Sequence, residues 1–171
     1  MKVNKAILLL ATIIIVATAC NKDDDPVAES CTEELNYSVN ADQLALDISK
    51  IDQFLLENNI DAIEDSTGLR YVIKELGTGD TPLICKDIAI VYTGRLMSDS
   101  TIFDTTAGAV KFPLNNLILG WKIGIPKIKE GGWIQLFIPS QLAYGSAGRS
   151  NIPENANLLF DIILYEAYLE E

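Results

Sequence analysis

Two stretches in the second half of the chain decide the fold: residues 133–138, WIQLFI, and residues 158–165, LLFDIILY. Both are rich in the β-branched and aromatic residues that strands favour. In the first stretch Ile134, Leu136 and Ile138 occupy every second position, so in a strand they share one face. That spacing predicts a strand with one face buried in a core.

The sequence before these stretches adds further strands and a short helix. Residues 69–76, 88–96 and 110–114 are also β-rich. One helix is indicated at residues 117–124, and Pro126 would end it because proline lacks the backbone donor that a helix needs. Several strands that do not alternate regularly with helices predict an α+β fold built on an antiparallel sheet.

A separate helical segment is predicted N-terminal to the strands, over residues 40–67. Asn40 can cap a helix, with Gln43 three residues later. The apolar residues that follow form one helical stripe: Leu44, Ile48, Ile51 and Leu55. We place the charged residues of the segment, Asp47 among them, off that stripe, and expect the helix to end near residues 58–59. One such helix cannot fold alone. It either packs on the C-terminal domain or pairs two chains; we favour packing, and a monomer.

Composition and charge exclude several classes of function. The 171 residues include 24 Asp and Glu against 13 Lys and Arg, a net charge of -11, and an acidic surface does not suit nucleic acid. The sequence contains no histidine, which excludes Ser-His-Asp and Cys-His catalysis and histidine-ligated zinc. Its three cysteines are too few for a site of four thiolates. We therefore expect no nucleic-acid partner, no metal and no cofactor.

Residues 1–19 have the pattern of a secretory signal peptide. Two lysines precede an apolar run, residues 6–17, that is too short to span a bilayer comfortably. Cys20 ends the sequence ATAC, which resembles a bacterial lipobox, where the signal is removed and the cysteine is acylated. An ordinary signal peptide followed by an unrelated cysteine is the alternative.

Residues 20–39 are then predicted to be a lipid-anchored tether. Acidic residues 23–25 suit a solvated linker and also resemble the acidic stretch behind the lipid-bearing cysteine of surface-exposed lipoproteins. We expect a cell-envelope protein anchored to the outer membrane through Cys20, on either its periplasmic or its outer face. In that oxidising compartment Cys31 and Cys85 could form a disulfide, although the sequence does not show that they are neighbours.

Seven short motifs carry the functional information. In order they are YTG at residues 92–94, FD at 103–104, GW at 120–121, IPS at 138–140, LAYG at 142–145, IP at 152–153 and LLFD at 158–161. Any one of them occurs by chance, but together their order and spacing closely resemble the FKBP-type peptidyl-prolyl cis-trans isomerases. The resemblance covers roughly residues 68–169 and predicts an isomerase domain over residues 68–171.

The resemblance implies both a fold and a site. The fold is a curled antiparallel sheet of five or six strands wrapped around one short helix, here with an extra N-terminal helix. The site is an aromatic pocket for proline, floored by an indole. The residues implied in catalysis are Tyr92, Phe103, Asp104, Trp121, Tyr144 and Phe160. Those implied in further substrate contacts are Val110, Phe112, Leu117, Ile118 and Ile152.

The implied activity is rotation about X–Pro peptide bonds in unfolded or exported proteins, whose proline-containing segments would be the partners. A binding module or chaperone that captures such segments with little turnover is the alternative. The presence of the whole set of pocket aromatics favours catalysis over capture.

Three departures from the family pattern concern the pocket. The loop at residues 105–109 is shorter than in small members and lacks the arginine that often pairs with the pocket aspartate, so we expect a less firmly oriented Asp104. Arg149 stands at the rim, where small members often carry histidine. Val110 replaces a phenylalanine, and we expect Phe112 to pack behind it.

Overall fold

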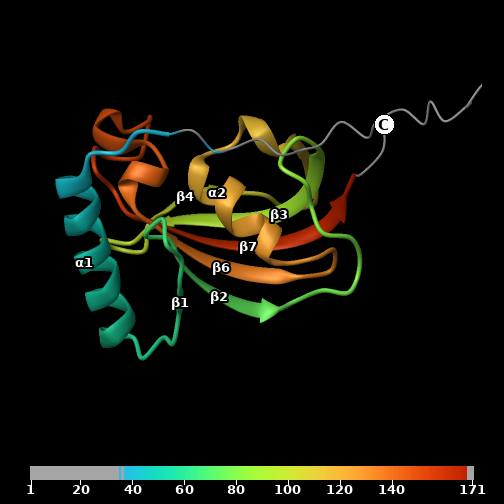
Figure 1. Cartoon of the computed structure of the whole chain (residues 1–171), viewed down its shortest axis with the longest axis horizontal. Helices are drawn as coiled ribbons and strands as arrows, with labels where there is room; N and C mark the ends of the chain where they lie inside the picture. The colour runs from blue at the N-terminus through green and yellow to red at the C-terminus, as the bar shows by residue number, and fades with distance from the viewer. Residues whose placement is uncertain (1–34, 36, 169–171) are drawn as a thin grey trace, which may run out of the picture. The chain divides into compact units, whose positions relative to one another are not determined.

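An antiparallel sheet of seven strands organises the part of the chain that the computed structural model describes, residue 35 and residues 37–168 (Figure 1). The strands are β1 (Ile63–Glu64), β2 (Arg70–Glu75), β3 (Asp87–Leu96), β4 (Ile102–Thr105), β5 (Val110–Pro113), β6 (Trp133–Ile138) and β7 (Leu158–Ala167). The α-helices in these residues are α1 (Ala41–Glu57) and α2 (Leu119–Gly124). The predicted α+β fold is confirmed. Its sheet has seven strands rather than five or six because the very short β1 and β4 also join it.

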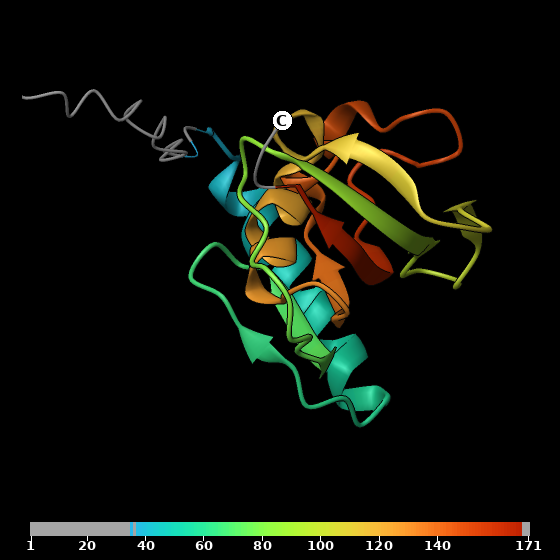
Figure 2. The same cartoon turned by 90° about the vertical axis from the view of Figure 1, so that its right-hand side faces the viewer.

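The longest strands, β3 and β7, form the centre of the sheet. The strand order is β1-β2-β6-β7-β3-β4. β3 pairs with β7 along one edge and divides its other edge between two partners, β5 at its start and β4 near its end. This division lets β4 and β5 diverge, and Figure 2 shows how strongly the strands twist relative to one another.

The inner face of the sheet packs against α2. Ile134, Leu136 and Ile138 are fully buried, as their alternation predicted. Gly120 of α2 allows close approach, because a Cβ atom at that position would lie 2.5 Å from the Ile138 side chain. A larger residue at position 120 would push the helix away from β6.

The outer face of the sheet is covered in part by α1. Asn40 caps this helix as predicted, its side chain accepting a hydrogen bond from the Gln43 backbone N–H at 3.0 Å. Ile51 and Leu55 form a buried cluster with Phe137, which points away from α2 because it alternates with its neighbours in β6. The helix therefore packs on the sheet, the first of the two expected alternatives.

The prediction that Asp47 lies off the packed face of α1 is wrong. Asp47 is fully buried. Its carboxylate accepts hydrogen bonds from Ser140 Oγ at 2.5 Å and Gln43 Nε2 at 2.8 Å. The physical reason is that Asp47 lies one helical turn before Ile51, so it shares the packed face, and the burial of its charge is compensated by these donors.

The features predicted for the N-terminal part lie outside the described residues. These are the signal peptide at 1–19, the lipidated Cys20, Cys31 and most of the tether at 20–39. Cys85 is disulfide-bonded, and its pairing with Cys31 stays a prediction. No helix within residues 37–168 is both long and apolar enough to cross a bilayer.

We expect Asp47→Ala to lower the free energy of unfolding by about 1–3 kcal/mol, since it leaves the buried Ser140 hydroxyl without its acceptor. Urea denaturation measures this loss. The control is Asp61→Ala, which removes the same charge from an exposed position. Equal stability of the two variants would show that the buried hydrogen bond does not stabilise the attachment of α1.

Candidate functional site

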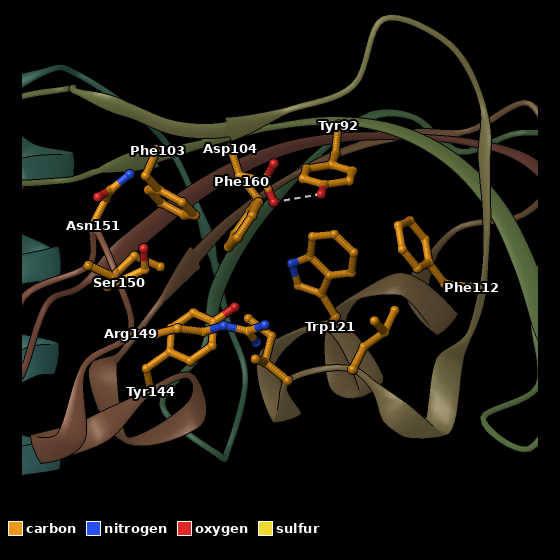
Figure 3. Close-up of a pocket in the computed structure, with 13 residues that line it drawn as sticks. Tyr92, Phe103, Asp104, Phe112, Trp121, Tyr144, Arg149, Ser150, Asn151 and Phe160 are labelled. Atoms are coloured by element: carbon orange, nitrogen blue, oxygen red, sulfur yellow. Dashed lines mark hydrogen bonds between the residues drawn. The ribbon is translucent and has the colours of Figure 1, made fainter.

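A cavity of about 330 Å³ opens between α2, the inner face of the sheet and the loop that precedes β7 (Figure 3). Aromatic rings from four different strands, from α2 and from that loop reach it. Because these elements are far apart in the sequence, the cavity exists only in the folded domain.

The floor of the cavity is the indole of Trp121, which is 5% exposed. Two rings meet it edge to face, Tyr92 with ring centroids 4.9 Å apart and Phe160 with centroids 5.0 Å apart. Aromatic quadrupoles favour this perpendicular geometry. The floor is thus fixed by contacts with β3 and β7, which are adjacent strands.

The wall beside Phe160 depends on a glycine. Phe103 meets Phe160 edge to face, with ring centroids 5.5 Å apart. Both rings cross over Gly94 of β3, where a Cβ atom would lie 2.6 Å from Phe160 and 2.7 Å from Phe103. The glycine of the YTG motif therefore makes room for the two rings.

One carboxylate faces this aromatic cavity. The Tyr92 hydroxyl donates a hydrogen bond to Asp104 Oδ2 at 2.7 Å. Burial, and then this hydrogen bond, raise the pKa of Tyr92 well above its ordinary value, so the hydroxyl stays protonated as a donor at neutral pH. Asp104 is thereby oriented by Tyr92, although it forms no ion pair with an arginine of the described residues.

The indole of Trp121 also carries an unused donor. Its Nε1 atom is buried and has no hydrogen-bond acceptor among the described residues. A buried donor without an acceptor costs about 1–3 kcal/mol.

Comparison with known proteins decides the family. A model of the FKBP-type peptidyl-prolyl cis-trans isomerase family matches residues 80–165, about half of the chain. The chain belongs to this family.

Relatives of this FKBP-type chain include two bacterial enzymes named FKBP-type peptidyl-prolyl cis-trans isomerase FkpA. That of Escherichia coli strain K12 is 41% identical over 104 residues, which are 59% of this chain and 38% of that protein. That of Aeromonas hydrophila is 40% identical over 101 residues, 57% of this chain and 37% of that protein. The chain thus spans well under half the length of the curated relatives that it matches.

Solved structures agree with the assignment of the fold. The crystal structure of FkpA from Escherichia coli superposes with a TM-score of 0.64 at 36% identity, covering 74% of this chain and 59% of that one. A peptidyl-prolyl cis-trans isomerase from Pseudomonas syringae superposes with a TM-score of 0.62 at 25% identity, covering 77% and 98%. The curled sheet with its central short helix is therefore an FKBP fold.

The FKBP-type pocket gathers all but one of the residues expected to form it. Those that line the cavity are Tyr92, Phe103, Asp104, Phe112, Leu117, Ile118, Trp121, Tyr144, Ile152 and Phe160. Val110 is not among them and is 38% exposed. The expected packing of Phe112 behind Val110 is thus corrected: both lie on one face of β5, but Phe112 reaches the cavity and contacts Tyr92, with ring centroids 6.3 Å apart.

Three further residues line the pocket: Arg149, Ser150 and Asn151. They form a turn closed by two backbone hydrogen bonds between Arg149 and Ile152, of 2.9 and 2.7 Å. The motifs on either side of this turn were recognisable, but Ser150 and Asn151 carry no chemical signal of their own. Only the closure of the turn brings them to the rim.

We expect the wild type to lose stability more steeply than Tyr92→Phe as the pH rises above the ordinary tyrosine pKa of about 10. The folded pKa of Tyr92 is raised, so its contribution is complete below the unfolded pKa and is lost as the pH rises toward the folded pKa. Thermal unfolding at a series of alkaline pH values measures the difference. Tyr165→Phe, at an exposed position, should keep the wild-type slope; an unchanged slope in Tyr92→Phe contradicts the assignment.

Proposed function

We propose that this chain is an active peptidyl-prolyl cis-trans isomerase that accelerates rotation about X–Pro bonds in unfolded, exported proteins. The observation that carries the proposal is the cavity floored by Trp121 and walled by aromatic rings. Membership of the FKBP family supports the same activity. The proline ring would lie on the indole, with the X–Pro bond above it.

The reaction requires no acid, base or metal in this proposal. Rotation is slow because the C–N bond has partial double-bond character, with a barrier of roughly 18–20 kcal/mol. Water stabilises the planar amide through its polar carbonyl, and the twisted amide has less charge separation. A dry pocket therefore favours the twisted state relative to the planar one. An acceleration of about 10⁴-fold needs only about 5–6 kcal/mol of such preference.

Two polar groups would orient the twisting bond. The Tyr144 hydroxyl lies at the cavity wall and would donate a hydrogen bond to the carbonyl of residue X. Asp104, held by Tyr92, would face the displaced carbonyl carbon. Both would act by a hydrogen bond or by charge, and neither transfers a proton.

We expect Trp121→Ala to lower kcat/KM for an X–Pro tetrapeptide by at least about tenfold, a loss of about 1.4 kcal/mol of transition-state stabilisation. A protease-coupled cis-to-trans assay measures this. Trp133→Ala is the matched control, because that indole is 43% exposed and lies outside the cavity. Asp104→Ala tests the carboxylate while every aromatic ring of the cavity is kept.

The assay also separates catalysis from capture. Wild-type kcat/KM in both Trp121→Ala and Asp104→Ala would contradict the catalytic assignment. Binding of the peptide by wild type without acceleration would instead support a binding module.

We also propose that the protein is a lipoprotein of the cell envelope, anchored through Cys20. The support is the basic start, the short apolar run and the ATAC sequence ending at Cys20.

We expect Cys20→Ser to move the protein from the membrane fraction to the soluble fraction of its native host, because a single change removes the acylated sulfur. Immunoblots of fractionated cells measure the distribution. The control is Cys85→Ser, which breaks a disulfide but keeps Cys20 and should therefore stay in the membrane fraction. If Cys20→Ser stays with the membranes, the protein is not anchored through this residue.

A further inference from the structure

The two charged residues that line the pocket stand on opposite sides of it. Asp104 is the anion and Arg149 the cation among the lining residues. In Figure 3, Asp104 lies with Tyr92 on one side of the Trp121 indole, and Arg149 lies with Tyr144 on the other. A peptide lying across the indole therefore meets a negative charge at one wall and a positive charge at the other.

Arg149 has no acidic partner in the described part of the chain, although the protein carries a net charge of -11. The other two arginines are both paired, Arg70 with Asp52 and Arg95 with Asp161. The charge of Arg149 is thus available to a ligand, whereas Asp104 already accepts a hydrogen bond from within the protein.

The position of Arg149 is held from two sides. Its guanidinium carbon lies 5.6 Å from the centroid of the Tyr144 ring, within the range of a cation–π contact. Its backbone is fixed by the paired hydrogen bonds to Ile152. These contacts place the guanidinium beside Tyr144.

We infer that the pocket favours an acidic residue at X over its uncharged isostere and over Lys, and that Arg149 is the residue that determines this preference. The inference rests on the proposed function, in which the Tyr144 hydroxyl binds the carbonyl of residue X. The side chain of X is then next to Arg149. A Glu or Asp carboxylate at X can accept two hydrogen bonds from the guanidinium, and a Lys at X is repelled.

The expected preference is modest because Arg149 is exposed to solvent. Exposed ion pairs correspond to about a two- to fivefold change in an equilibrium. We therefore expect kcat/KM for a Glu-Pro peptide to exceed that for its uncharged isostere, Gln-Pro, by about two- to fivefold, and Lys-Pro to be the poorest of the three.

The test compares Ala-Glu-Pro-Phe, Ala-Gln-Pro-Phe and Ala-Lys-Pro-Phe on wild type, Arg149→Gln and Arg149→Glu. Arg149→Gln should bring the Glu:Gln ratio close to one, and Arg149→Glu should reverse the order so that Lys-Pro becomes the best. Lys74→Gln makes the same change in net charge at an exposed site on β2 away from the cavity, and should keep the wild-type ratios.

The outcomes separate this inference from the function on which it rests. If wild type accelerates all three peptides and Arg149→Gln leaves the Glu:Gln ratio unchanged, the specificity assignment is wrong and the isomerase activity stands. If wild type accelerates none of them, the proposed function fails, and the inference with it. A ratio that changes equally in Lys74→Gln and Arg149→Gln would assign the preference to net charge and overturn the role of Arg149.

Discussion

The edge-to-face packing of Trp121 against Tyr92 and Phe160 is the contact on which the rest of the structure depends. It joins α2 to β3 and β7, the two long strands at the centre of the sheet. It also forms the floor of the cavity, so one set of contacts both closes the core and shapes the site. Rings are suited to this double role, since they combine a large apolar area with a preferred mutual geometry.

The sheet packs against a helix on each of its two faces because successive side chains of a strand point to opposite faces. In β6, Leu136 and its alternate neighbours face α2, and Phe137 faces α1. Arg70, at the start of β2, is almost fully buried and binds the carboxylate of Asp52 in α1 through two hydrogen bonds of 2.9 and 3.2 Å. The N-terminal helix is therefore part of the folded domain and not an appendage to it.

Much of the fold and of the pocket could be predicted from sequence because these features depend on local sequence patterns. Period-two alternation predicted β6, the Asn40 cap predicted the start of α1, and the ordered motifs predicted the pocket. The errors arise where a residue's surroundings come from distant parts of the chain. Asp47 reads as a surface charge until Ser140 is known to face it. Val110 and Phe112 are two positions apart and share one face of the strand, so their spacing does not distinguish them. Only the path of β5 decides which one reaches the cavity.

Asp47 also links the outer helix to the wall of the pocket. Its carboxylate accepts from the Ser140 hydroxyl, and its backbone carbonyl accepts from Asn157 Nδ2 at 3.0 Å. Asn157 in turn accepts from the Ser140 backbone N–H at 3.1 Å, which closes a ring of three hydrogen-bonded residues.

This ring holds both ends of one segment of the pocket. Ser140 begins and Asn157 ends the stretch that carries Tyr144 and the turn at Arg149. Fixing the two ends of such a loop removes much of the conformational freedom between them. Asp47 of α1 therefore positions the part of the cavity that carries Tyr144 and Arg149, without touching it. This gives a physical reason for the N-terminal helix to pack on the side of the sheet that faces away from the site.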